Sequence, residues 1–469
     1  MSRRRLLLVF VLLVLAFNAV LFYSFYIVNP KTLDELYHKV FIHTHYDADR
    51  LSQRREEDTG TKTEDKDPTE RVEKQKAIPS TPAAKVKTPK AKKEPNQPID
   101  TSRTEILPIL VLACNRPTVS RCLDLLLRYR AQSTASHPII VSQDCGHEPT
   151  AQAIRSYGDQ IRHIEQPDLS SIPMQGGSPA MQGYYKISRH YKWALTQIFD
   201  VMKYDSVIIV EGTLLVTYAL RALGDVFGLG SLDDLDVSPD FFEYFLATRK
   251  LLEEDSTLWC VSAWNDNGKE NLIDLNKPEL IYRSDFFPGL GWMMRLSLWN
   301  EIKDKWPKAF WDDWMRESEQ RKGRACLRPE ISRTRTFGKE GVSKGQFYDN
   351  HLRYIVLSDK NVHFLKQDLT YLLKSNYDKG FVSRVYRIPT RSLSSIDSQR
   401  GCGDAKEARV EYLTAGQFVS YARQFGIMND LKDQVPRLAY KGIVSFMYGG
   451  CRVHLAPPAN WKGYENSRK

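Results

Sequence analysis

Acidic residues that could hold a divalent cation follow an apolar strand in the middle of the chain. Residues 206–211 read Ser-Val-Ile-Ile-Val-Glu, and a second acidic cluster containing Asp233 and Asp234 comes after an apolar interlude. Without residues 212–232, the two parts join into a buried strand followed directly by Glu-Asp-Asp. Carboxylates are hard oxygen ligands, which suit Mg²⁺ or Mn²⁺. The pattern predicts a metal site that faces a diphosphate, and it shows an interruption inside that site.

Other polar residues follow the strands predicted nearer the start of the folded region. Apolar runs at 106–113 and 138–142 flank a helical pattern, and a second helix at 185–201 precedes the strand at 206–210. Strands that are apolar throughout indicate a parallel sheet covered on both faces, as in Rossmann-like α/β folds. Such sheets bind ligands at the carboxyl ends of their strands, where Arg116, Asp144 and Glu211 fall.

The second half of the chain is rich in aromatic residues and then becomes more weakly patterned. We expect loops at 285–292 and 305–314, the second of which places Asp312 between Trp311 and Trp314. The polar, glycine-rich stretch at 338–345 has the composition of a mobile lid. Strands expected at 440–446 and 452–455 indicate a smaller C-terminal domain.

The N-terminus predicts a membrane anchor. Three arginines precede an apolar run at 6–28, which as a helix would be about 33 Å long and could cross a bilayer. Positive charges in front of the run place the N-terminus in the cytoplasm. A cleaved signal peptide is the alternative, but the run is long for one and lacks a clear cleavage site. The predicted organisation is a tail at 1–5, a signal anchor at 6–28, a largely disordered stem at 29–104, a nucleotide-binding catalytic domain at 105–337, a lid and linker at 338–360 and a C-terminal domain at 361–469.

The composition excludes some classes of protein. A chain of 469 residues with 42% hydrophobic residues can bury a sizeable core, so the protein as a whole is not disordered. Much of the net charge of +10 lies at the extreme N-terminus and in the Lys- and Pro-rich stem, where it marks a solvated tether. With the folded part in the secretory lumen, nucleic acid is not expected as a partner, and the 7 cysteines can form disulfides with one left over.

Five motifs carry a resemblance to one enzyme family. They lie at 139–147 (Ile-Ile-Val-Ser-Gln-Asp-Cys-Gly-His), 259–268 (Trp-Cys-Val-Ser-Ala-Trp-Asn-Asp-Asn-Gly), 285–292 (Asp-Phe-Phe-Pro-Gly-Leu-Gly-Trp), 310–314 (Phe-Trp-Asp-Asp-Trp) and 328–333 (Arg-Pro-Glu-Ile-Ser-Arg). In these motifs the chain resembles the N-acetylglucosaminyltransferase I family, from about residue 106 to 464. The resemblance implies a GT-A glycosyltransferase fold, a single-pass type II protein of the Golgi membrane, UDP-GlcNAc as donor and manganese (Mn²⁺) as cofactor. The implied reaction is inverting transfer of GlcNAc to the 2-hydroxyl of the alpha-1,3 mannose of a high-mannose N-glycan.

The resemblance also implies roles for individual residues. Asp312 matches the catalytic base and Asp234 the metal ligand. The implied donor contacts are Arg116, Asp144, His190, Glu211, Asp233 and Ser343. Cys114 with Cys145 and Cys260 with Cys326 match disulfides of the family, whereas the pairing of Cys122, Cys402 and Cys451 stays open.

The chemistry explains why these residue types are needed. Inversion in one displacement requires a carboxylate that takes the proton of the acceptor hydroxyl, and the charge of the leaving diphosphate must be neutralised. Flanking tryptophans would partly desolvate Asp312 and strengthen it as a base; whether Asp313 shares the role stays open. Structural interpretations exist too: Asp233 and Asp234 as acids at a helix N-terminus, Arg116 as a turn residue and His190 as a packed histidine.

Residues 212–232 have no counterpart in the family pattern. We interpret them as translated intron sequence or an error in gene prediction, which transcripts spanning the junction would test. If they are present, we expect weak or no activity, because catalysis tolerates misplacements of only about an ångström. Two alternatives remain: a Golgi-anchored homologue that binds UDP-sugar without turnover, and the related O-mannose beta-1,2-N-acetylglucosaminyltransferase. The stem has no room for an extra sugar-binding domain, which argues against the second.

Overall fold

The computed structural model describes residues 106–130, 136–173, 181–211, 235–337, 348–349, 351–398 and 401–464. All of them belong to one compact unit, Pro95–Lys469. The predicted anchor and stem, the stretch at 212–232, and Asp233, Asp234 and Ser343 lie outside these ranges. Among the residues that are described, no helix has the length and hydropathy needed to cross a membrane.

The described residues form an eight-stranded central sheet in the order β3-β2-β1-β4-β8-β6-β9-β7. Its strands are β1 (Ile109–Ala113), β2 (Ile139–Gln143), β3 (Arg162–Glu165), β4 (Ser206–Glu211), β6 (Leu258–Ser262), β7 (Ile281–Ser284), β8 (Trp292–Arg295) and β9 (Ala325–Pro329). The first four strands in this order pair in parallel, as the sequence predicts for β1, β2 and β4, whereas β3 was not predicted. β8 runs antiparallel to both β4 and β6, and β7 runs antiparallel to β9, so the sheet is mixed rather than parallel throughout.

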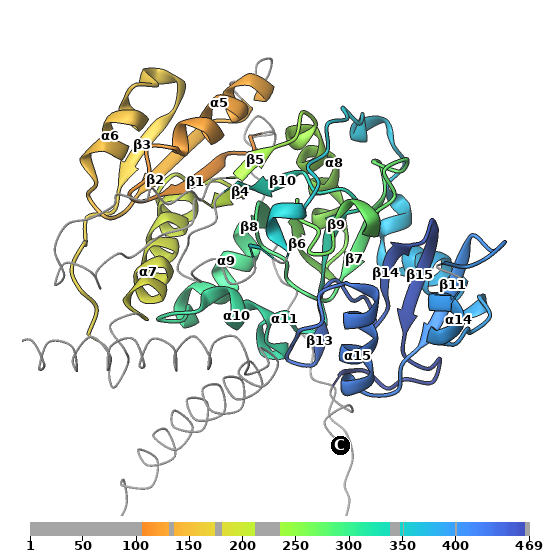
Figure 1. The fold of residues 1–469 in the computed structure, drawn as a ribbon. Coiled ribbons are helices and arrows are strands. Elements are labelled where there is room, and N and C mark those ends of the chain that lie inside the picture. Colours follow the sequence, from red (N-terminus) through yellow and green to blue (C-terminus); the bar gives the residue numbers. More distant parts are fainter. Residues whose placement is uncertain are drawn as a thin grey trace, which may run out of the picture. The chain divides into compact units, whose positions relative to one another are not determined.

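Helices cover both faces of this sheet, which gives three layers (Figure 1). The side chains of β1 alternate between the faces, as the period of two in a strand requires. Ile109 and Val111 pack with α5 (Val119–Arg130) and α8 (Phe241–Glu254), while α6 (Glu148–Arg155) flanks α5. Leu110 and Leu112 pack with α7 (Gln182–Thr196), α9 (Leu296–Ile302) and α10 (Trp311–Arg316). The Rossmann-like α/β prediction is confirmed.

A smaller sheet lies in the C-terminal part (blue in Figure 1). Its order is β11 (Glu407–Glu411), β15 (Cys451–Ala456) and β14 (Val444–Tyr448), and α15 (Ala415–Phe425) packs into the same core. The Thr414 hydroxyl caps α15 by accepting from the Gln417 amide, and Gly426 ends the helix at φ 74°. Leu272 and Phe286, which precede this region by more than 100 residues, complete the core. The division of the chain at residue 361 stays a prediction.

The remaining short elements connect these layers. They are β5 (Leu235–Val237), which pairs with β10 (Thr334–Thr336), the hairpin of β12 (Leu431–Lys432) and β13 (Val435–Pro436), and the helices α11 (Ser318–Arg321), α12 (Lys374–Tyr377), α13 (Ser383–Arg387) and α14 (Leu393–Ser398).

Candidate active site

Three predicted site residues lie at one edge of the central sheet. Asp144 follows β2, Arg116 comes shortly after β1, and Glu211 ends β4. These strands are neighbours and parallel, so their carboxyl ends share an edge. Because β8 is antiparallel to β4, its first residue, Trp292, lies at this edge as well. The placement that the sequence predicts for the three residues is therefore correct, while their roles stay predictions.

A disulfide fixes the two loops that carry Arg116 and Asp144. Cys114 and Cys145 directly follow β1 and β2, and their Cα atoms are 5.2 Å apart. The Asp144 amide also donates to the Ala113 carbonyl at 2.9 Å. Asp144 and Arg116 are both buried. The disulfide and this backbone hydrogen bond therefore hold together the two loops that carry Arg116 and Asp144.

His190 lies on α7 and is fully buried. Its Nε2 is 2.8 Å from the Ser142 hydroxyl on β2. Burial lowers the pKa of His190 to about 4, although the nearby Asp144 carboxyl opposes the shift. The imidazole is therefore neutral at neutral pH. Its Nδ1 is buried and has no hydrogen-bond partner among the described residues.

Glu211 has an environment that sequence reasoning did not anticipate. Burial raises the pKa of its carboxyl to about 7, and the negative charge of Asp312 adds to this shift. The polar groups of the neighbouring Tyr191 and Trp292 side chains act in the opposite direction. Tyr191 directly follows His190 on α7. This helix therefore supplies one residue beside Asp144 and the next residue beside Glu211 and Asp312.

Asp312 lies in the first turn of α10, which Phe310 enters in the left-handed conformation, at φ 52°. Its Oδ2 accepts from Arg316 Nη1 at 2.7 Å, one helical turn further on. The expected loop at 305–314 is thus wrong for its last residues, which are helical. The Asp312 side chain is 45% exposed, so the surroundings of this carboxylate desolvate it only in part. Trp311 turns inward and stacks between Trp292 and Trp306, which leaves Asp312 on the outer side of the helix.

Asp313 is engaged through both carboxylate oxygens. Oδ1 accepts from Arg316 at 2.8 Å, and Oδ2 accepts from Lys432 at 2.9 Å. Among the described residues, the Asp312 carboxylate makes one hydrogen bond, to Arg316 through Oδ2. Its Oδ1 therefore stays available to take a proton. This difference favours Asp312 over Asp313 as the base, a choice that the sequence left open.

An aromatic pair borders Asp312. Tyr184 on α7 stacks on Phe310, with ring centroids 4.5 Å apart, and Phe310 is 39% exposed. Burial raises the pKa of Tyr184, and the negative charges of Asp312 and Asp313 add to the shift. The exposed Phe310 ring, backed by the partly buried Tyr184 ring, offers an apolar surface beside the predicted base.

Sequence reasoning missed several residues of this site: Tyr184, Tyr191, Trp292, Phe310 and Arg316. Arg316 carried a usable signal, since an arginine four residues after an aspartate pairs with it if the segment is helical. The predicted metal ligand, Asp234, directly precedes β5 but lies outside the described residues, as do Asp233 and Ser343. Among the residues described, no group of three or more His, Cys, Asp or Glu side chains could hold a metal ion.

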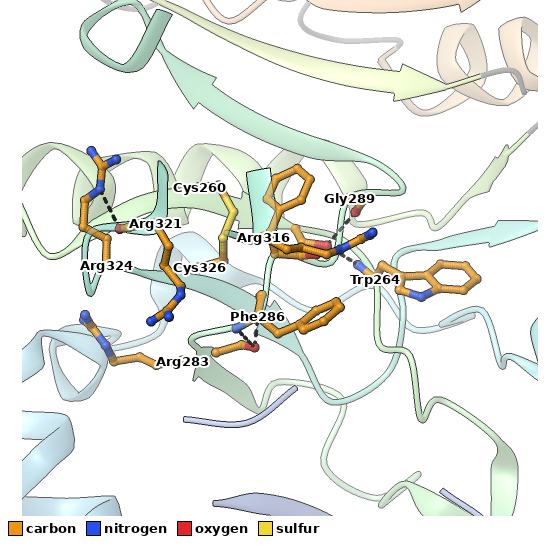
Figure 2. The surroundings of a disulfide bond; sticks show 12 residues. Cys260, Trp264, Arg283, Phe286, Gly289, Arg316, Arg321, Arg324 and Cys326 are labelled. Carbon is orange, nitrogen blue, oxygen red and sulfur yellow. Dashed lines mark hydrogen bonds between the residues drawn. A yellow bond between two sulfur atoms is a disulfide. The ribbon is translucent and has the colours of Figure 1, made fainter. Parts of the chain in front are cut away.

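Both predicted disulfides, Cys114–Cys145 and Cys260–Cys326, are present. The second joins neighbouring strands β6 and β9 beneath the site, and Figure 2 shows Phe286 and Arg316 in its surroundings. The open pairing is resolved by a third bond, Cys402–Cys451, at the start of β15. Cys122, which is buried on α5, belongs to none of the three.

The chain matches a family model described as the GNT-I family over residues 7–220 and 230–468. It is 38% identical over 340 residues to an alpha-1,3-mannosyl-glycoprotein 2-beta-N-acetylglucosaminyltransferase of Arabidopsis thaliana, covering 72% of this chain and 70% of that protein. The break in the family match, at 221–229, falls inside the atypical stretch at 212–232.

Solved structures show only distant similarity. TarS of S. aureus in complex with UDP-GlcNAc is 11% identical, with a TM-score of 0.30, over 56% of this chain and 62% of that one. Its UDP complex gives a TM-score of 0.31 at 10% identity, over 64% and 80% of the two chains. The mannosyltransferase PcManGT of Pyrobaculum calidifontis, with GDP-Man and Mn²⁺, gives 0.22 at 12% identity, over 41% and 46%. Scores this low carry no argument about the site.

Proposed function

Because the chain belongs to the GNT-I family, we propose that it transfers GlcNAc from UDP-GlcNAc to the 2-hydroxyl of the alpha-1,3 mannose of a high-mannose N-glycan. This step would start the synthesis of hybrid and complex N-glycans. The GT-A class follows from family membership and agrees with the three-layer α/β fold. The observation that carries the proposal is the Asp312 carboxylate, which is accessible, oriented by Arg316 and close to Glu211.

The donor would bind along the carboxyl ends of β1, β2 and β4. Arg116 offers a guanidinium suited to phosphate oxygens, and it is fixed by the neighbouring Cys114–Cys145 bond. Asp144 and the neutral imidazole of His190 offer hydrogen-bonding groups for a nucleobase. A neutral imidazole suits a neutral base, because no charge has to be desolvated when the ligand binds.

The reaction needs one proton acceptor. As the acceptor 2-hydroxyl oxygen bonds to C1 of GlcNAc, the bond from C1 to the diphosphate oxygen breaks, and the hydroxyl proton passes to Asp312. Arg316 holds Oδ2, so Oδ1 is the oxygen that takes the proton. Attack opposite to the leaving UDP inverts the configuration at C1. The exposed Phe310 ring, and the edge of the partly buried Tyr184 ring stacked on it, would contact the apolar face of an acceptor sugar.

We further propose Mn²⁺ as the cofactor and the Golgi membrane as the location. Asp234 would hold the metal ion, and its carboxylate is the hard oxygen ligand that such an ion prefers. When bound, the ion would neutralise charge on the diphosphate of the leaving UDP. The anchor predicted at 6–28 would place the catalytic part in the lumen.

The atypical stretch at 212–232 favours one second candidate, a homologue that binds UDP-sugar with impaired turnover. It separates Glu211 from Asp233 and Asp234, and the family match breaks within it. Calorimetric titration with UDP in the presence and absence of Mn²⁺, using the full chain and a version without 212–232, tests donor binding, and an assay of GlcNAc transfer by the same two versions separates the possibilities. The transferase proposal expects Mn²⁺-dependent UDP binding in the shortened version. Failure of both versions to bind UDP would contradict it.

A further inference from the structure

The helix that carries Asp312 is held from the C-terminal part of the chain. Lys432, at the end of β12, donates to Asp313 on α10 at 2.9 Å. In the turn that follows, Asp433 accepts from the Ser318 amide at the start of α11 at 2.5 Å. Figure 1 shows α10, α11 and β13 next to one another. The hairpin thus contacts both short helices that follow Phe310.

A tight turn joins the two strands of the hairpin. Its two turn residues, Asp433 and Gln434, both have positive φ, at 46° and 66°. This conformation matches a type I′ turn, whose twist suits a tight two-residue hairpin. Lys432 therefore lies at the end of a paired strand, opposite Val435.

Arg316 connects the hairpin to Asp312. Its Nη1 donates to Asp313 and to Asp312, at 2.8 and 2.7 Å, so one nitrogen joins the two carboxylates. Its Nε donates to the Phe287 carbonyl at 3.1 Å, and its guanidinium lies 5.1 Å from the Phe286 ring (Figure 2). Arg316 is buried, so its position is determined by these contacts rather than by solvent.

A second arginine, Arg437, packs against the same Phe286 ring as Arg316. Arg437 follows the hairpin in the chain, and its guanidinium lies 4.9 Å from the centre of the Phe286 ring. It is fixed by Asp430 at 2.8 Å and by the buried Asp266 at 3.0 Å. The support of Arg316 therefore includes residues from both the central sheet region and the C-terminal part.

We propose that Lys432 is a positioning residue, which acts through Asp313 and Arg316 to hold the Asp312 carboxylate in the orientation needed to accept the acceptor proton. This inference rests on the proposed function of Asp312 as the base. Without Lys432, Asp313 can swing toward Arg316 with both oxygens and compete with Asp312 for Nη1. The Lys432–Asp313 ion pair is half exposed, so it contributes little to the free energy of unfolding. We expect its loss to lower the rate of catalysis instead.

The charged and titratable groups around Asp312 decide how the pH dependence responds. Arg316 and Asp313 lie on its own helix, Tyr184 and Tyr191 face it from α7, and Glu211 faces it from β4. Lys432 and Arg437 bear on it from the C-terminal side through Asp313 and Arg316. Removing the positive charge of Lys432 makes protonation of Asp312 easier, so the acidic limb of kcat/KM moves to higher pH. Removing the negative charge of Asp313 moves that limb to lower pH.

The test compares Lys432→Met and Asp313→Asn with a matched control, Lys374→Met. Lys374 pairs with Asp378 at 2.8 Å and is 44% exposed, close to the 39% of Lys432, but it lies away from α10. Each is made in the full chain and in the version without 212–232. We expect kcat to fall about tenfold in the first two variants, with the donor KM unchanged. The acidic limb should move by about half a pH unit, upward for Lys432→Met and downward for Asp313→Asn.

Two outcomes overturn the inference: wild-type kcat in Lys432→Met, or shifts of the acidic limb in the same direction in both variants. Hydrogen exchange of residues 311–316 supplies a readout that does not need turnover. Faster exchange in Lys432→Met, but not in Lys374→Met, is the expected result, and equal exchange contradicts the proposal. If wild-type chains of both versions fail to transfer GlcNAc, the proposed function falls, and the exchange measurement still decides whether Lys432 holds α10.

Discussion

The Ser142 hydroxyl and the His190 imidazole are 2.8 Å apart, joined across β2 and α7 in a region closed to solvent. This contact holds a neutral histidine beside Asp144 at the carboxyl edge of the sheet. Burial of His190 has two consequences. It keeps the imidazole neutral for the predicted contact with a nucleobase, and it makes protonation of the folded protein at this side chain unfavourable.

The stability of the protein should therefore fall in acid through His190. The pKa of this side chain is about 4 when folded and about 6.5 when unfolded, so between these values the unfolded chain binds the proton more readily. Stability falls as pH falls through that window, by about 2.5 kcal/mol at pH 4.5. Denaturant unfolding at pH 7 and pH 4.5 should show a smaller pH effect in His190→Gln by about 2 kcal/mol. The exposed-histidine control His363→Gln should keep the wild-type effect, and an unchanged effect in His190→Gln would contradict the account.

Replacement of Asp312 should abolish most of the turnover. Asp312→Asn keeps the size of the side chain but removes the proton acceptor, so we expect kcat to fall by about 10²–10⁴. Asp313→Asn, whose carboxylate positions rather than reacts, should lose only about tenfold. Steady-state kinetics with UDP-GlcNAc and a five-mannose glycan measure both. A larger loss in Asp313→Asn than in Asp312→Asn would reverse the assignment.

The Cys114–Cys145 bond should matter for the donor and not only for stability. Without it, the loops that carry Arg116 and Asp144 gain freedom, and we expect the KM for UDP-GlcNAc to rise about tenfold in the Cys114→Ala/Cys145→Ala variant. The Cys402→Ala/Cys451→Ala variant is the control, because that bond closes a loop of comparable length in the smaller sheet. Each loss should cost about 2–5 kcal/mol of unfolding free energy. A similar donor KM in the two variants would show that the first bond is only structural.

The exposed Phe310 ring should affect the acceptor alone. Phe310→Ala removes apolar surface beside Asp312, and we expect the KM for the glycan to rise about tenfold while the KM for UDP-GlcNAc stays unchanged. Leu413→Ala, at an exposed position of the smaller sheet region, is the control for loss of a surface hydrophobic residue. If Phe310→Ala changes the donor KM instead, the ring belongs to the nucleotide site.

The sequence predicted the start of the central sheet well, for a physical reason. The apolar runs that become β1, β2 and β4 are buried on both faces, so burial alone identifies them and puts Arg116, Asp144 and Glu211 at one edge. Burial does not reveal the direction in which a strand runs, so the antiparallel orientation of β8 was not predicted. Trp292 lies at this edge because β8 is antiparallel to β4, although the sequence at 285–292 predicted a loop.

The surroundings of the base were harder to predict, because they depend on contacts between distant segments. Arg316 is four residues after Asp312, but it can be identified as a partner of Asp312 only when 311–316 is known to be helical. Lys432 lies more than 100 residues away from Asp313, and no local pattern connects the two. The exposure of Asp312 was also set by the fold, since Trp311 occupies the interior and turns its neighbour outward.

The most direct test of the central claim is transfer of GlcNAc from UDP-GlcNAc to a five-mannose N-glycan in the presence of Mn²⁺. The full chain and the version lacking 212–232 are compared, and the linkage of the product is determined. The account predicts one GlcNAc, beta-1,2-linked to the alpha-1,3 mannose, formed by the shortened version, with little or no product from the full chain. Equal turnover by both versions would show that residues 212–232 do not impair catalysis. Absence of transfer by both, or transfer to O-linked mannose instead, would contradict the proposed function itself.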